Sequence, residues 1–244
     1  MEDRYKYILS VIENEYDADA VLRQTDTVRI ASYVHKASEK RILLIVAEGQ
    51  DSDTVKSLIG TKCRNVPEIY DVCTNGDETL IIEEFITGTR LSDILGEKKL
   101  KAAEAVKYCI NICDALAFLH SNNIVHRDIK PSNIIINADN EAMLIDLQTA
   151  RKISEEHDND TKNLGTVGYA APEQFGIVQS MPSTDIYALG VMLNEMLTGK
   201  HPSIQTPEGK LGRIIEKCTH TQMLKRYQDV YELKKDLKQC RRIK

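Results

Sequence analysis

The stretch NIVHRDIKPSNIII, residues 123–136, is the part of the sequence that best indicates its fold. Aliphatic runs stand at both of its ends, and its centre is densely polar. That centre supplies a carboxylate, two cations and an amide within a few positions: His126, Arg127, Asp128, Lys130, Ser132 and Asn133. Polar groups packed this closely between two apolar runs indicate a loop that is braced by the core and serves a functional site.

The composition sets the class of protein around this loop. With 244 residues, of which 42% are hydrophobic and 28% charged, the chain has ordinary globular composition and enough length for one large domain or two lobes. The net charge of −5 gives no sign of nucleic-acid binding. Lysine and arginine crowd the end, from Lys234 to Lys244, and we interpret this run as the solvated face of a last helix.

The cysteines and the apolar runs indicate a reduced, cytoplasmic chain without a membrane segment. None of the six cysteines forms a Cys-x-x-Cys pair, and Cys109 and Cys113 are spaced for one face of a helix, where core packing is expected. No signal peptide precedes the start, and no apolar run approaches the roughly 20 residues that span a membrane.

The hydrophobic pattern predicts a strand-rich part followed by a helix-rich part, with a boundary near residues 86–90. Residues 27–49 are predicted to form two strands around the turn Ser-Glu-Lys. Two more strands are predicted around the turn Asn-Gly-Asp, in the stretches EIYDVCT and TLIIEEFI. A short helix is expected near 51–60. From residue 101 apolar residues recur at helical spacing, which predicts helices over about 101–120, 184–198, 207–219 and 228–240.

Three motifs in the correct order resemble those of protein kinases. The sequence His-Arg-Asp at 126–128 with Asn133 matches the catalytic loop, Asp146 in LIDLQ stands where an Asp-Phe-Gly motif begins, and GTVGYAAPEQF at 165–175 matches the end of an activation segment. The resemblance is to the bacterial branch of Ser/Thr kinases. It implies one bilobal α+β kinase domain over 1–244, with a small antiparallel-sheet lobe (1–86), a hinge at about 84–88 and a mostly helical lobe (89–244).

The resemblance also implies roles for the catalytic residues. Asp128 would accept the proton of the substrate hydroxyl, and Lys130 would offset charge on the transferring phosphate. Asn133 and Asp146 would hold Mg²⁺, and Thr166 would pack against Asp128 and Lys130. ATP would be the phosphate donor, and a Ser or Thr of a protein substrate would be the acceptor.

Further positions would support that site. Asp185 would anchor the loop backbone, and Arg226 would pair with Glu173. His126 and Leu147 would join a hydrophobic column between the lobes. The Arg127 side chain would meet an anion on the activation segment, such as a phosphorylated Thr161 or Ser154. Nucleotide contacts are expected from four residues: Leu43, Glu84, Ile86 and Ile135.

The first lobe departs from the family pattern where phosphates are normally held. Aligning KRILLIVAEG with the third strand puts Ile45 where a lysine normally binds the α- and β-phosphates. The acidic stretch IENEYDADAVLRQTDTV stands in place of the Gly-rich loop and has no glycine, which keeps backbone amides away from phosphate. Glu83 falls at the gatekeeper position behind the adenine, and Gln148 replaces the glycine that normally follows Asp146 and Leu147.

Two functions of different class remain open. One is a weakly active Ser/Thr kinase in which another cation, such as Arg23, Arg29 or Lys56, replaces the missing lysine. The other is a pseudokinase that serves as a regulatory or scaffold module for a protein partner. A small-molecule phosphotransferase would share the loop pattern, but Ala-Pro-Glu normally serves protein substrates. If the first hairpin turned elsewhere, Lys36 or Lys40 would be the phosphate lysine.

Overall fold

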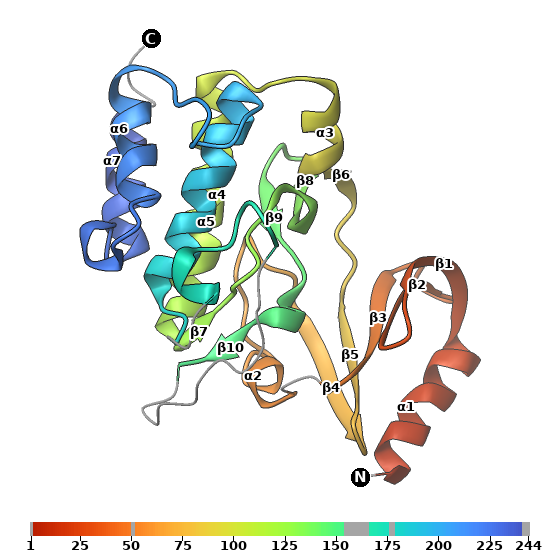
Figure 1. The fold of residues 1–244 in the computed structure, drawn as a ribbon. Helices are drawn as coiled ribbons and strands as arrows, with labels where there is room; N and C mark the ends of the chain where they lie inside the picture. Colours follow the sequence, from red (N-terminus) through yellow and green to blue (C-terminus); the bar gives the residue numbers. More distant parts are fainter. Residues whose placement is uncertain (1, 50–51, 154–165, 176–178, 241–244) are drawn as a thin grey trace. The chain divides into compact units, whose positions relative to one another are not determined.

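The structure is a computed structural model that describes residues 2–49, 52–153, 166–175 and 179–240. The chain divides into two compact units. The sheet unit comprises residues 1–63 and 67–86, and the helical unit comprises residues 64–66 and 87–244. The first contains a five-stranded antiparallel sheet and the second is mostly helical, which confirms the predicted α+β class (Figure 1).

Both hairpins predicted for the sheet unit are present, because a polar turn separates two strand-forming runs in each. The strand order is β1-β2-β3-β5-β4, and each neighbouring pair is antiparallel. A short helix, α2 (Ser52–Lys56), comes between the two hairpins. The strands are β1 (Tyr16–Gln24), β2 (Val28–His35), β3 (Arg41–Glu48), β4 (Ile69–Asn75) and β5 (Glu78–Glu84).

An N-terminal helix, which the strand-rich prediction missed, covers one face of this sheet. Helix α1 (Glu2–Glu15) carries buried apolar residues at helical spacing. The cluster that they form with the strands consists of Tyr5, Ile8, Ile12, Ile42, Leu44, Cys73 and Leu80. Because side chains alternate along a strand, Leu43 and Ile45 of β3 lie on the opposite face of the sheet from α1.

The register of the β2–β3 hairpin excludes the alternative assignment of the phosphate lysine. The turn occupies residues 35–40, where His35 N donates to the carbonyl oxygen of Lys40 at 2.9 Å. Lys36 Nζ donates to backbone oxygens near the end of α1, and Lys40 lies over the ring of Tyr70. The alternative that Lys36 or Lys40 holds phosphate is therefore wrong, and Ile45 remains the aligned residue.

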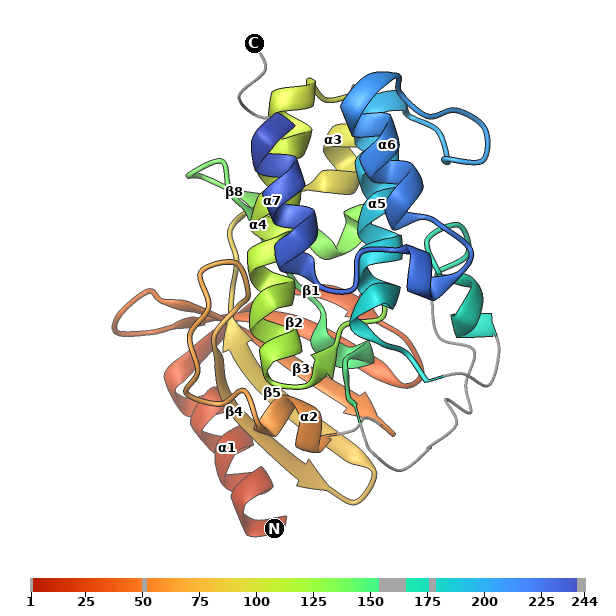
Figure 2. The ribbon, with the colours of Figure 1, turned by 90° about the vertical axis from the view of Figure 1, so that its left-hand side faces the viewer.

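Four long helices of the helical unit run side by side (Figure 2). Helix α4 contacts α5 and α7, and α6 also contacts both of these. The close approach of α5 to α6 requires Gly190, since an added Cβ would lie 2.3 Å from Cβ of Cys218. The helices of this unit are α3 (Leu91–Glu97), α4 (Ala102–Ser121), α5 (Pro182–Thr198), α6 (Gly209–Cys218) and α7 (Val230–Cys240).

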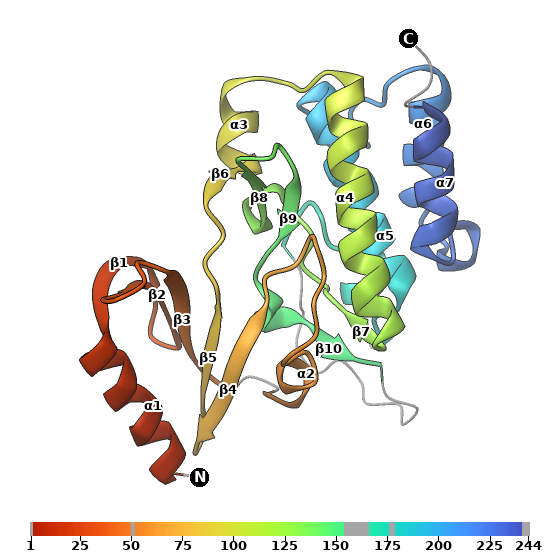
Figure 3. The ribbon, with the colours of Figure 1, turned by 180° about the vertical axis from the view of Figure 1, so that it is seen from behind.

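Two small sheets of the helical unit fix the ends of the polar loop at 126–133. The loop begins directly after β7 and ends where β8 begins. Strands β8 and β9 form a hairpin that lies beside α4, as the view from behind shows (Figure 3). The sheets contain β6 (Gly88–Arg90), β8 (Ile134–Asn137) and β9 (Ala142–Leu144) in one, and β7 (Ile124–Val125) and β10 (Arg151–Lys152) in the other.

The cysteines behave as core residues. Cys109 and Cys113 are fully buried on α4, and all six cysteines are free thiols. Burial raises the pKa of Cys113 to about 12, so its thiol is protonated and unreactive at neutral pH. Among the residues that the structure describes, no helix combines the length and the apolar character needed to cross a membrane.

The packing of α1 predicts that this helix stabilises the sheet unit. Replacing Ile8, which is 7% exposed, by alanine should lower the free energy of unfolding by about 2–4 kcal/mol, because the methyl groups lost leave a cavity in the cluster between α1 and the sheet. Replacing Tyr7, which is 67% exposed on the same helix, should change it by no more than about 0.5 kcal/mol. Urea denaturation measures both. Equal losses for the two variants would contradict the packing.

Candidate active site

The carboxylate of Asp128 is the centre of a hydrogen-bonded cluster in the polar loop. Its Oδ2 lies 2.7 Å from Lys130 Nζ and accepts a hydrogen bond from Asn133 Nδ2 at 3.0 Å. Its Oδ1 accepts from the hydroxyl of Thr166 at 2.7 Å, and Lys130 Nζ donates to the same hydroxyl at 2.8 Å. The contact expected between Thr166, Asp128 and Lys130 is therefore present.

These contacts keep Asp128 ionised. Burial by itself would raise the pKa of this carboxyl, but the hydrogen bonds from Lys130 and Thr166 outweigh it, and the pKa lies below its ordinary value. An ionised carboxylate that is already oriented can accept a proton from a hydroxyl that approaches it. The geometry thus supplies a general base together with an adjacent ammonium.

Asn133 and Asp146 are brought together by the β8–β9 hairpin. Asn133 precedes β8, and its carbonyl oxygen accepts from Ile145 N at 2.9 Å, so the two ends of the hairpin lie side by side. Asp146 follows directly and adopts the left-handed conformation, with φ 68° and ψ 72°. The Nδ2 atom of Asn133 also donates to the carbonyl of Asp128, which leaves its Oδ1 as an acceptor.

This donor set suits a magnesium ion that also binds phosphate. Asp146 and Asn133 offer oxygen ligands, and Mg²⁺ in proteins commonly takes one or two such ligands and completes its shell with phosphate and water. Within residues 2–49, 52–153, 166–175 and 179–240, no three His, Cys, Asp or Glu residues gather as a self-sufficient metal site. The residues present therefore fit a metal that arrives with a nucleotide.

A buried carboxylate on α5 holds the backbone at the start of the loop. Asp185 is 1% exposed and accepts from the backbone N–H groups of His126 at 2.9 Å and Arg127 at 2.8 Å. It also accepts from His120 Nε2 at 2.9 Å. Burial alone would raise the pKa of Asp185, but the hydrogen bond from His120 and the imidazole of His126 hold it below its ordinary value.

The activation segment is tied to the loop by residues that the sequence did not single out. The side-chain amide of Gln174 donates to the carbonyl of Arg127 at 2.9 Å, and Thr149 donates to the carbonyl of His126 at 3.0 Å. Arg127 Nε donates to the carbonyl of Thr149 at 2.9 Å. The partners are more than twenty positions apart in the chain, so no local pattern indicates them. A phosphorylated Thr161 or Ser154 was expected to supply the anion that meets Arg127. Both residues lie outside the described part of the chain.

The expected ion pair between Glu173 and Arg226 is present and buried. Arg226 is 2% exposed and binds both carboxylate oxygens of Glu173, at 2.6 and 2.9 Å. Thr184 donates to the same carboxylate at 3.0 Å. Burial would raise the pKa of Glu173, but the guanidinium lowers it further than burial raises it. This pair links the end of the activation segment to the sequence before α7.

A surface hollow of about 400 Å³ adjoins the Asp128 cluster. Lys130 and Thr166 form part of its wall, and residues of α3, the polar loop, the segment around Tyr169 and α5 form the rest. Its acidic member is Glu195 on α5, whose carboxylate accepts the hydroxyl of Tyr169. Burial and this carboxylate raise the pKa of Tyr169, so the phenol remains protonated and continues to donate. No local pattern in the sequence indicates this hollow, because its walls come from four distant segments.

The residues expected to contact the nucleotide belong to both units. Leu43 lies on β3, Glu84 ends β5 and Ile86 follows it, all in the sheet unit, whereas Ile135 lies on β8 of the helical unit. Glu83, at the expected gatekeeper position, is 4% exposed. The acidic stretch expected in place of a Gly-rich loop consists of the end of α1, strand β1 and the turn at 25–27.

The buried ion pair yields a matched test. Replacing Glu173 by glutamine should cost about 3–5 kcal/mol of unfolding free energy, because the buried guanidinium of Arg226 loses its counter-charge. Glu141 pairs with Arg64, whose side chain is 77% exposed, so the same change there should cost at most about 1 kcal/mol. Urea denaturation compares the two, and equal costs would contradict a structural role for the buried pair.

Comparison with known proteins agrees with this geometry. The model of the protein kinase domain matches residues 21–242. Serine/threonine-protein kinase PAK 4 of Mus musculus is 32% identical over 151 residues, which are 62% of this chain and 26% of that protein. A probable serine/threonine-protein kinase of Clostridium acetobutylicum is 37% identical over 140 residues, which are 57% of this chain and 21% of that protein.

A plant protein is similar over a comparable range. The leucine-rich repeat receptor-like protein kinase TDR of Arabidopsis thaliana is 34% identical over 162 residues, 63% of this chain and 15% of that protein. The chain thus spans about a quarter or less of the length of these curated relatives. Since the family model covers nearly all of the chain, and the catalytic-loop and activation-segment residues make the contacts described above, the chain belongs to the protein kinase domain family.

Proposed function

We propose that this chain transfers the γ-phosphate of ATP to a Ser or Thr hydroxyl of a protein, with Mg²⁺ held by Asp146 and Asn133. The observation that carries the proposal is the cluster around Asp128, which unites a general base, an ammonium and a hydroxyl within 3 Å contacts. A structural role alone does not require this set. Family membership and the similarity to Ser/Thr kinases support the same conclusion.

In this mechanism Asp128 accepts the proton of the attacking hydroxyl, and its lowered pKa keeps it ionised at neutral pH. Lys130, held between Asp128 and Thr166, lies where it can offset charge on the transferring phosphate. Bound Mg²⁺ would neutralise phosphate charge and orient the terminal phosphate for in-line attack. The hollow beside Lys130 offers room for the protein segment that carries the acceptor.

We further propose that the activity is weak. Ile45 offers neither charge nor a donor where a lysine normally holds the phosphates, and the turn at 25–27 contains no glycine. Removal of one such electrostatic contact typically costs on the order of a thousandfold in rate. The all-thiol cysteines and the need for ATP support a cytoplasmic location.

A pseudokinase is the second candidate function. It is favoured by Ile45 and by the contacts that keep Lys36 and Lys40 at the β2–β3 turn. In that case the chain would serve as a regulatory or scaffold module, and the Asp128 cluster would have no chemical role.

Replacing Asp128 by asparagine discriminates between the two functions. We expect phosphate transfer from Mg-ATP to a Ser/Thr protein substrate to fall at least about a hundredfold, because asparagine cannot accept the proton. The matched control is Asp139→Asn, which removes an exposed carboxylate in the β8–β9 turn and should leave the rate unchanged. Transfer of radiolabelled phosphate measures both. Equal rates for the two variants would exclude catalysis through Asp128 and support the pseudokinase.

A further inference from the structure

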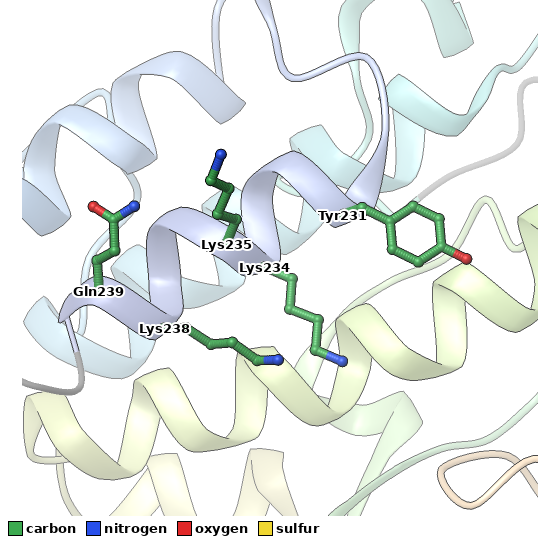
Figure 4. Close-up of a pocket in the computed structure, with 5 residues that line it drawn as sticks. All are labelled: Tyr231, Lys234, Lys235, Lys238 and Gln239. Atoms are coloured by element: carbon green, nitrogen blue, oxygen red, sulfur yellow. The ribbon is translucent and has the colours of Figure 1, made fainter.

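The outer side of α7 carries three lysines around a shallow hollow (Figure 4). This helix turns Val230, Leu233 and Leu237 toward the core of the helical unit. Its opposite side borders a hollow of about 380 Å³, lined by Tyr231, Lys234, Lys235, Lys238 and Gln239. Tyr231 is 64% exposed and stands at one end of the row (Figure 4).

The lining consists almost entirely of hydrogen-bond donors. Lys234 forms an ion pair with the carboxylate of Asp114 on α4, which shows that a lysine of this surface binds a carboxylate. The Oε1 atom of Gln239 accepts from Lys210 at 2.7 Å, so the amide NH₂ remains available to donate. In the part of the chain that the structure describes, Lys235 and Lys238 form no ion pair. The hollow therefore suits an anionic ligand with several acceptor atoms.

The charge of this surface is opposite to that of the chain. Among the described positions 234–240, three are lysines and one is acidic, whereas the whole chain carries a net charge of −5. The acidic residue, Asp236, accepts the hydroxyl of Tyr227 at 2.8 Å and does not line the hollow. A local positive potential remains on an otherwise acidic protein.

We propose that this hollow binds an acidic segment of a partner protein, whose carboxylate or phosphate groups contact Lys235 and Lys238. The two lysines stand three positions apart on α7, a rise of about 4.5 Å, and alternate acidic side chains of an extended segment repeat at about 7 Å. Figure 4 shows the Lys235 side chain pointing to one flank of α7 and the Lys238 side chain to the other, so a segment that contacts both lysines crosses the helix. The ring of Tyr231 offers an apolar wall for the backbone of such a segment.

A short protein segment fits this surface better than a membrane or a nucleic acid. At 0.1 M salt, charges more than about 10 Å apart are largely screened from one another. A short segment in the hollow therefore interacts mainly with the lysines that line it. A bilayer or a duplex extends much further and meets the rest of a chain whose net charge is negative. Within the helical unit, α4 and α5 stand between α7 and the β8–β9 hairpin (Figures 1 and 3), so a segment on α7 leaves the Asp128 cluster free.

Fluorescence anisotropy with the full chain tests the proposal. The probe is a fluorescein-labelled peptide of alternating Glu and Ser, and its matched control has Gln in place of each Glu. The acidic peptide should bind and the Gln peptide should not, and binding should weaken as salt rises from about 50 to about 300 mM. The double variant Lys235→Gln/Lys238→Gln should bind the acidic peptide about fivefold or more weakly.

A second double variant provides the charge control. Lys98→Gln/Lys225→Gln removes two exposed lysines elsewhere on the helical unit and should bind as the unchanged chain does. Equal losses for the two double variants, or equal binding of the Glu and Gln peptides, would overturn the proposal. Vesicles that contain phosphatidylserine form the last arm. Binding of vesicles through Lys235 and Lys238 without binding of the peptide would also overturn it, and would assign the surface to a membrane instead.

Discussion

The arrangement of the active site depends on the buried carboxylate of Asp185. It accepts the N–H groups of His126 and Arg127, and these hydrogen bonds offset the cost of burying its charge. Arg127 has a φ of 69°, a conformation that an L-residue rarely adopts, and its N–H is one of the groups fixed in this way. The chain can then turn so that Asp128 faces Lys130 and Thr166. A helix residue nearly sixty positions away thus sets the geometry of the loop.

The two units differ in how much of the phosphoryl-transfer chemistry they retain. The helical unit contains the residues proposed as the base, the ammonium and the metal-binding oxygens, together with the buried Glu173–Arg226 pair. The sheet unit keeps the antiparallel sheet but has Ile45, 2% exposed, at the position aligned with the phosphate lysine. Helix α1 covers the core of this unit, and that packing involves no nucleotide. Stability of the sheet unit and affinity for phosphate are therefore separate properties in this chain.

Much of this could be predicted from the sequence, because the signals are local. The hairpins have polar turns between apolar runs, and α4 and α5 have strong helical periodicity. Helix α1 was not predicted, although its buried residues Tyr5, Ile8 and Ile12 recur at helical spacing. Strand β1 is exposed on both faces from Asp17 onward, so no alternation of apolar and polar residues indicates it.

The contacts between distant segments were only partly predictable. Family motifs indicated Asp185 and the Glu173–Arg226 pair, because their positions are fixed relative to the loop. The hydrogen bonds from Gln174 to the Arg127 carbonyl and from Tyr169 to Glu195 join distant segments, and no periodic pattern in the sequence indicates them. The lysines of α7 were visible as a charged run, but their arrangement around a hollow depends on which face of the helix is buried.

We propose that the oxygens of Asp146 and Asn133 bind Mg-ATP although Ile45 stands where a lysine is usual. Thermal unfolding with and without excess Mg-ATP measures this binding, with Asp146→Asn as the comparison. Ligand at a hundred times its dissociation constant should add about 2.7 kcal/mol of stability, and this gain should be lost without Mg²⁺ and in the Asp146→Asn chain. No stabilisation at millimolar Mg-ATP, or equal stabilisation of both chains, would contradict the account.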